Sequence, residues 1–252
     1  MSILALSLSL CFVLLAVVLS RSFKLGLEKD VLIAMIRAAV QLLIIGYVLN
    51  AIFGLENLWV VGLFVLLMIT VAALNVSKKG KNIPQITLKI FATLVVVEII
   101  TQAIMLGLGI IPAHARYIIP ISGMIIGNSM VLSSLLVTRL KSEVQLRQRE
   151  IIVVLSMGGT PRQAILPVLK SAVRSSMIPT IDGQKTIGLV QLPGMMTGQI
   201  IAGADPITAV RFQLLIVFTL MTSAIITSIL LGLLITPSLF NKQQQLLLKP
   251  LE

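Results

Sequence analysis

Two ionisable side chains, Arg37 and Glu98, lie inside long apolar segments of this 252-residue chain. At a rise of about 1.5 Å per residue, Arg37 lies roughly 9 Å and Glu98 roughly 15 Å from the end of its segment that adjoins a basic loop. An ionisable group at the centre of a bilayer costs roughly 3 kcal/mol or more, so it normally faces a partner or water. These two residues are therefore the first candidates for chemistry or for helix pairing.

Each ionisable residue has a glutamine one helical turn further on, Gln41 after Arg37 and Gln102 after Glu98. Each helix therefore presents a two-residue polar stripe on one face. Three interpretations stay open. The stripes could pair and fix the register of their helices, Glu98 could face a cavity as a cation or proton site, or Arg37 could extend to the lipid headgroups.

Other polar and sulfur-containing side chains also occur in apolar segments, without the spacing of a ligand cluster. Methionine can offer a thioether contact to a metal, yet it more often fills space between helices. We therefore name no metal ligand. The candidate translocation pathway consists of Arg37, Gln41, Glu98, Gln102, Asn128, Gln191, Pro193, Met195, Met196 and Gln199.

Seven apolar runs of roughly 20 residues, the length that a membrane-spanning helix needs, position these groups. They cover residues 3–19, 31–53, 58–76, 88–111, 117–137, 186–204 and 212–236. With 57% hydrophobic and 12% charged residues, the composition excludes an ordinary soluble domain. We predict an all-α polytopic membrane protein with about seven transmembrane helices in a single domain over residues 1–252.

The basic residues indicate the orientation of this domain. Of the 20 Lys and Arg residues, 17 lie in the loops after the first, third, fifth and seventh segments or at the adjoining helix ends. The positive-inside rule places that side in the cytoplasm, with the N-terminus outside and the C-terminus inside. The net charge of +11 therefore indicates contact with anionic membrane lipid and not with nucleic acid. No basic region precedes the first run, so we expect a retained helix and not a signal peptide.

The largest polar insertion, residues 139–185, has the pattern of a cytoplasmic helical hairpin between helices five and six. A charged, helix-favouring stretch should continue the fifth helix as far as a turn at Gly158 and Gly159. Thr160 is then a predicted N-cap, with Pro161 at the first helical position and Gln163 completing a capping box. The following amphipathic helix should end before Pro179.

This hairpin has two possible roles. It could lie on the lipid surface as a basic interfacial helix, or it could be a rigid lever that presents its turn to a cytoplasmic partner. We favour the lever, because a membrane anchor needs no capped glycine turn. The predicted contact residues are Ser156, Met157, Gly158, Gly159, Thr160, Pro161, Arg162 and Gln163.

The sixth apolar run, residues 186–204, contains four glycines, two glutamines and Pro193. Because proline removes a backbone donor, the helix should be kinked or broken there. Broken helices at membrane depth usually line a cavity or a tight interface. The spacings of Gly123 with Gly127 and of Gly194 with Gly198 match the G-x-x-x-G pattern of close helix packing.

Several catalytic motifs do not occur in this sequence. It has no G-x-x-x-x-G-K-[S/T] nucleotide loop, no H-E-x-x-H zinc motif and no G-x-S-x-G elbow. We therefore expect neither catalysis nor a bound cofactor in this polypeptide alone.

Three stretches carry a family resemblance: residues 155–164 (LSMGGTPRQA), 178–199 and 201–210. They resemble the FetB-type permeases of iron-export ABC transporters and the related plant permeases of aluminium tolerance, most specifically at Leu192-Pro-Gly-Met-Met-Thr-Gly198. The resemblance implies a multi-pass permease of the bacterial inner membrane that exports iron or another metal ion. It also implies a separate cytoplasmic ABC ATPase subunit, which binds the ATP and Mg, with two copies of each subunit and therefore a permease homodimer.

Two rival functions remain. The chain could be a secondary transporter or channel with Glu98 as its cation or proton site, which would transport without an ATPase. It could also be a scaffold that tethers a cytoplasmic enzyme, in which case changes at Glu98 or in the sixth segment would leave transport intact.

Overall fold

The computed structural model describes residues 3–55, 57–81, 83–241 and 243–247, with side chains from residue 8 onward. Regular structure in this part of the chain is helical, apart from isolated bridges at Ile187–Gln191 and Phe240–Leu246. The chain divides into two compact units, Met1–Asn57 and Leu58–Glu252, and each is described by itself. The predicted all-α class is confirmed.

The first unit is a pair of packed helices, α1 (Ile3–Ser22) and α2 (Glu28–Leu55). Ser20 closes the turn between them: its hydroxyl donates to Glu28 Oε1 at 2.9 Å and accepts from the backbone N–H of Leu27 at 3.3 Å. Gly26 has a φ of +70° in this turn, a conformation that favours glycine.

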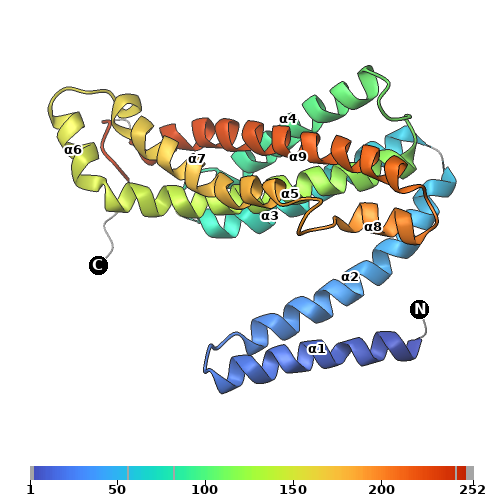
Figure 1. The fold of residues 1–252 in the computed structure, drawn as a ribbon. Coiled ribbons are helices and arrows are strands. Elements are labelled where there is room, and N and C mark those ends of the chain that lie inside the picture. The colour runs from blue at the N-terminus through green and yellow to red at the C-terminus, as the bar shows by residue number, and fades with distance from the viewer. Residues whose placement is uncertain (1–2, 56, 82, 242, 248–252) are drawn as a thin grey trace. The chain divides into compact units, whose positions relative to one another are not determined.

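The second unit contains the remaining helices. They are α3 (Leu58–Ser77), α4 (Ile86–Gly107), α5 (Ala115–Leu146), α6 (Gln148–Ser156), α7 (Pro161–Lys185), α8 (Gly194–Ile201) and α9 (Pro206–Ile235), with 3-10 turns at Lys78–Gly80 and Thr236–Leu239. The long α5 packs against α3, α7 and α9 (Figure 1). The chain reverses through α6, so that α7 returns along α5 (Figure 1).

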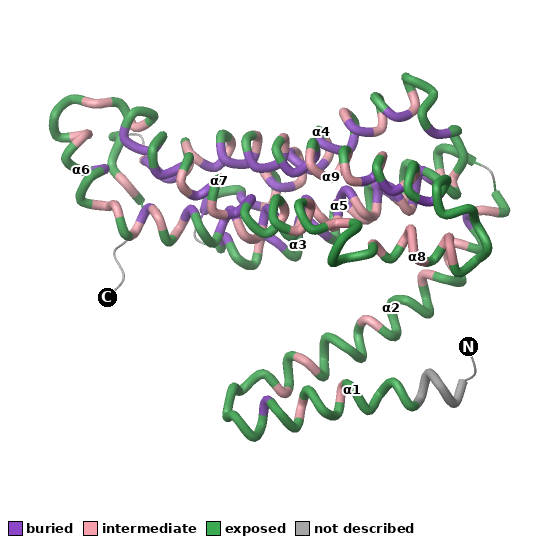
Figure 2. The backbone as a smooth tube through the Cα atoms, viewed as in Figure 1, coloured by how far each residue is buried: buried purple, intermediate pink, exposed green. Residues whose placement is uncertain are grey.

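The core of the second unit forms where α3, α4, α5, α7 and α9 meet. Leu136 and Leu140 of α5, Ala172 of α7 and Leu231 of α9 are almost fully buried in one cluster. Figure 2 shows buried residues running along the packed faces of α5, α7 and α9, with exposed residues on their outer faces. At roughly 25 cal/mol per Å² of apolar surface, such side chains contribute most of the stabilisation of the helix contacts.

Five helices among the described residues are long and apolar enough to cross a membrane: α2, α3, α4, α5 and α9. They correspond to the second, third, fourth, fifth and seventh predicted runs. The part of α1 whose side chains are described, Leu8–Ser22, is a shorter apolar helix. The chain is therefore a polytopic helical membrane protein, and the number seven, the orientation and the single domain over residues 1–252 stay predictions.

Three helix boundaries differ from the predictions. The expectation that the fifth helix continues to the glycine turn is wrong, because α5 ends at Leu146 and a separate helix, α6, covers Gln148–Ser156. The expectation that the helix after Thr160 ends before Pro179 is wrong, because α7 continues through Pro167 and Pro179 to Lys185. Packing along α5 and α9 stabilises α7, so the lost donors do not end it. The sixth apolar run is helical only over Gly194–Ile201, and Pro193 is the N-cap residue of α8. The predicted break at Pro193 is confirmed.

Candidate functional site

The turn between α6 and α7 is fixed on its first side by two glycines. Gly158 has a φ of +84°, and its N–H donates to the carbonyl of Leu155 at 3.0 Å. The N–H of Gly159 donates to the carbonyl of Val154 at 2.9 Å. Together these bonds form the Schellman arrangement that ends many helices.

The second side of the turn is fixed by the predicted capping box. The Thr160 hydroxyl accepts from the backbone N–H of Gln163 at 3.3 Å, and Gln163 Oε1 accepts from the N–H of Thr160 at 2.9 Å. Pro161 occupies the first position of α7. Backbone N–H and C=O groups at both helix ends thus find hydrogen-bond partners within a few residues. The α6–α7 hairpin is therefore rigid.

The surface around this turn suits a protein partner. Met157 at the tip is 83% exposed, and Ile152 and Val153 are also exposed. Beside the turn lies a mainly apolar groove of about 530 Å³ between the start of α7 and the end of α9. Its lining residues are Thr160, Pro161, Arg162, Ile165, Leu166, Leu169, Leu233, Thr236, Pro237 and Phe240. Exposed apolar surface next to a basic residue is typical of a docking site.

A second candidate site lies between α4 and α5. Glu98 is buried on α4, and its Oε1 accepts a hydrogen bond of 3.1 Å from Gln102 Nε2. The same amide nitrogen donates to the Ser122 hydroxyl of α5 at 2.8 Å. The predicted stripe of Glu98 and Gln102 therefore faces α5 through Ser122.

This cluster contains two buried oxygens without a hydrogen-bond partner among the described residues, Glu98 Oε2 and Gln102 Oε1. They belong to side chains that already contact each other. Within the described part of the second unit, Glu98 forms no ion pair. Because a buried carboxylate without a counter-charge is costly, the arrangement is suited to hold a proton or a cation with hard oxygen ligands.

The partner stripe, Arg37 and Gln41, lies on α2 in the first unit, at positions that are exposed. The two units are described separately, so pairing of Arg37 with Glu98 stays a prediction. No group of three or more His, Cys, Asp or Glu residues with the geometry of a metal site occurs among the described residues.

The other candidate pathway residues lie at two further places. Asn128 joins α5 to α9, because its Nδ2 donates to the carbonyl of Leu220 at 3.3 Å. The rest lie in or next to α8: Gln191 is exposed in the non-helical stretch before it, and Met195 packs against the cluster that contains Ile121 and Ile216. Met196 and Gln199 are partly exposed on α8.

The glycine pairs differ in their surroundings. A Cβ atom on Gly123 would lie 3.3 Å from Met68 Cε, so α3 and α5 approach closely there. A Cβ on Gly127, Gly194 or Gly198 would have no atom of the described residues within 4 Å. Of the four glycines in these two pairs, Gly123 is therefore the one at which described helices pack closely.

Buried serines of α5 are polar groups that the sequence analysis missed. Ser122, Ser129 and Ser133 are fully buried, and Ser129 accepts a hydrogen bond of 3.1 Å from the Thr227 hydroxyl of α9. Their spacing of seven and four residues puts them on one helix face, which was a usable signal. Small hydroxyl side chains at such positions allow close packing of membrane helices.

The fold and these sites define a multi-pass α-helical membrane protein whose polar groups lie between its helices and at one capped hairpin. The sequence matches the model of the uncharacterised protein family UPF0014 over residues 3–240, and the chain belongs to this family. The predicted FetB resemblance is confirmed by this match together with two relatives, one named FetB and one a plant protein named for aluminium sensitivity.

Three relatives indicate what kind of protein the family contains. The chain is 62% identical to the UPF0014 membrane protein YjkA of Bacillus subtilis, with 98% of each chain covered. It is 38% identical to the "Probable iron export permease protein FetB" of Escherichia coli, covering 98% of this chain and 96% of that one. It is 35% identical to the Arabidopsis thaliana protein ALUMINUM SENSITIVE 3, covering 94% and 87%. No solved structure matches the chain.

Proposed function

We propose that this chain is the permease subunit of an ABC exporter in the bacterial inner membrane, which moves iron or another metal ion. A separate cytoplasmic ATPase subunit binds ATP and Mg and supplies the energy. Two permease chains and two ATPase subunits form the complex. The relative named as an iron export permease supports the substrate class and the direction.

The observation that carries this proposal is the rigid hairpin and its direct connection to the broken segment. The capped turn at Gly158–Gln163 follows exposed Met157 and adjoins the groove between α7 and α9. From this turn α7 runs along α5 and α9 to Lys185, where the non-helical stretch begins. A partner that holds the turn differently with ATP and with ADP would therefore move the helix that leads to the break.

Purification of the tagged full-length chain from its own cell in a mild detergent tests the proposal. We expect an ATPase that contains a G-x-x-x-x-G-K-[S/T] loop to co-purify in equal amount, and mass spectrometry identifies it. A chain that stays free of any such ATPase, even after chemical cross-linking in the membrane, would contradict the proposal.

The unpaired oxygens at Glu98 favour one alternative, a secondary transporter or channel. Glu98 Oε2 and Gln102 Oε1 are buried without a partner among the described residues, as a proton or cation site in a transport path would be. This alternative requires that the chain alone, without ATP, transports along a proton or voltage gradient.

A further inference from the structure

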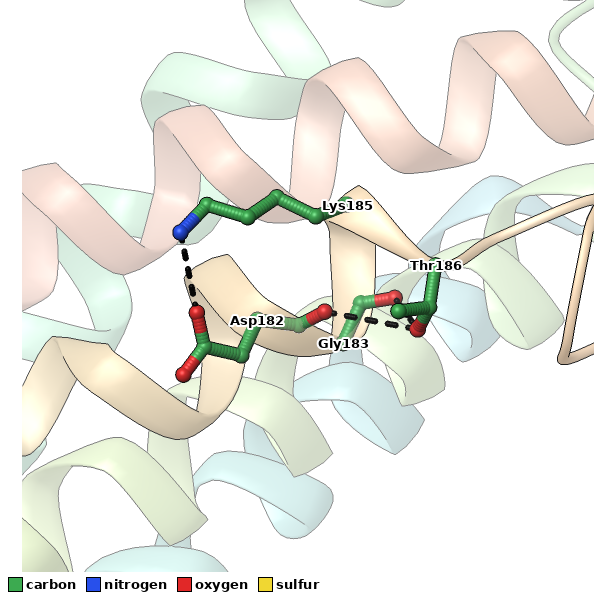
Figure 3. Close-up of polar contacts among 4 residues, drawn as sticks. All are labelled: Asp182, Gly183, Lys185 and Thr186. Atoms are coloured by element: carbon green, nitrogen blue, oxygen red, sulfur yellow. Dashed lines mark hydrogen bonds and ion pairs between the residues drawn. The ribbon is translucent and has the colours of Figure 1, made fainter.

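A charged pair lies at the carboxyl end of α7. Asp182 Oδ1 lies 3.0 Å from Lys185 Nζ, and both side chains are well exposed, at 60% and 69% respectively (Figure 3). The Thr186 hydroxyl donates to the carbonyl of Gly183 at 3.2 Å and thereby closes the last turn (Figure 3). The carboxylate of Asp182, the carbonyl of Gly183 and the hydroxyl of Thr186 thus all lie at the end of this helix.

The packing on both sides shows how deep this pair lies. Before it, Met177 packs with Leu132 of α5 and Ala224 of α9. After it, Met195 of α8 packs against the cluster that contains Ile121 and Ile125 of α5. Residues 178–194 thus connect two packed methionines whose clusters lie at the levels of Leu132 and Ile121 of α5, within its apolar span.

The backbone between α7 and α8 is irregular at this depth. Its hydrogen bonds are local, such as Gly188 N–H to the carbonyl of Gln191 at 2.9 Å and Val190 N–H to that of Thr186 at 3.0 Å. Leu189 is 91% and Val190 is 83% exposed. Irregular backbone and exposed charges are not tolerated against lipid, so water or protein must cover this face.

Water is favoured over a protein interface, because the core of an interface is depleted of charged side chains. The end of α7 also suits a cation. Its last carbonyl groups carry a partial negative charge, and the carboxylate of Asp182 lies in the last turn. Lys185 is the cation that this end holds in the structure.

We infer that α7, the break and α8 together form one discontinuous membrane crossing, and that the break lines an aqueous path. Asp182 binds the metal cation in this path when the Lys185 ammonium moves aside. Lys185 stays on the chain, so a divalent ion that enters adds two positive charges to the site, and an anion that enters with it offsets one of them. The claim that Asp182 binds the metal cation rests on the proposed transport function, whereas the claim of an aqueous path does not.

Cysteine labelling tests the aqueous path. In a Cys11→Ser background, single cysteines replace Leu189 or Val190 at the break and, as controls, Leu67 of α3 and Phe218 of α9, which are 57% and 65% exposed. Thiols react with a membrane-impermeant methanethiosulfonate only as thiolates in water. We expect the break positions to react at least about tenfold faster than the controls. Equal rates, or disulfide cross-links between two copies through Val190→Cys without labelling, would overturn the aqueous path.

Binding of Mn²⁺ to the purified full chain, followed by electron paramagnetic resonance, tests the cation site without the ATPase. We expect Asp182→Asn to lose this binding and Lys185→Gln to tighten it several-fold, while a Thr138→Ala control binds like the unchanged chain. Unchanged binding in Asp182→Asn, or absence of Mn²⁺ binding to all of these chains, would overturn the site. Failure of ATP-driven transport with normal Mn²⁺ binding would instead contradict the proposed function alone.

Discussion

A Cβ atom on Gly159 would lie 2.7 Å from Val154 Cγ1 and 2.8 Å from the Val154 carbonyl oxygen. That oxygen accepts the N–H of Gly159 and so belongs to the turn itself. Any larger residue at position 159 must therefore open the turn. The glycine requirement lies in the hairpin that we propose as the ATPase contact.

Gly159→Ala should weaken ATPase association several-fold without loss of membrane insertion, because the turn changes shape. Co-purification of the ATPase with the tagged chain measures this. Gly127→Ala is the matched control, since a Cβ there would meet no described atom within 4 Å. Equal ATPase recovery with both variants would contradict the docking role of the turn.

Thr160→Ala should destabilise the start of α7 by about 1 kcal/mol, because the backbone N–H of Gln163 loses its acceptor. The backbone amides at the start of α7 should then exchange with deuterium roughly fivefold faster, as measured by mass spectrometry. Thr138→Ala is the control, because that hydroxyl bonds only to the carbonyl of Ser134 in its own helix among the contacts that the structure describes. Unchanged exchange at the start of α7 would count against the capping box.

Gly232→Ala should destabilise the packing of α7 on α9, because the new Cβ would lie 2.7 Å from Leu169 Cδ1. We expect a loss of about 1 kcal/mol or more in the free energy of unfolding. Combining Gly232→Ala with Leu169→Ala should cost less than the sum of the two single changes. Thermal unfolding of the four proteins in detergent measures the difference, and strictly additive effects would show that the two residues do not contact each other.

Glu98→Gln should reduce transport at least about tenfold and change thermal stability little, if Glu98 binds the transported ion or a proton. Glu98→Ala should additionally lower stability, since Gln102 then loses its acceptor. Ser122→Ala removes the other acceptor of Gln102 and serves as the structural comparison. Full transport by Glu98→Gln, with stability lost in every variant, would favour a purely structural role for Glu98.

Local chemistry made the hairpin predictable. The glycine pair, Thr160, Pro161 and Gln163 specify the turn through contacts within ten residues, and the structure has each of them. The long apolar helices were predictable for the same reason, because length and composition alone define them. Their ends agree with the predicted runs to within a few residues in α2, α3 and α4.

Tertiary contacts decided what the sequence did not reveal. Pro179 is a local signal for a helix end, yet α7 passes it because Met177 and its neighbours pack into α5 and α9. The bond from Gln102 to Ser122 depends on the register of α4 against α5, which no single helix encodes. In the sequence, Asp182 and Lys185 belong to a polar insertion. Their depth depends on how far α7 returns along α5, which the packing of the two helices determines.

Transport by the purified chain in proteoliposomes tests the central claim most directly, with an enclosed metal-sensitive dye as the readout. We expect no accumulation of metal ion against a gradient with the chain alone, and ATP-dependent movement once the co-purified ATPase is added. Active transport by the chain alone, driven by a proton or voltage gradient, would contradict the account.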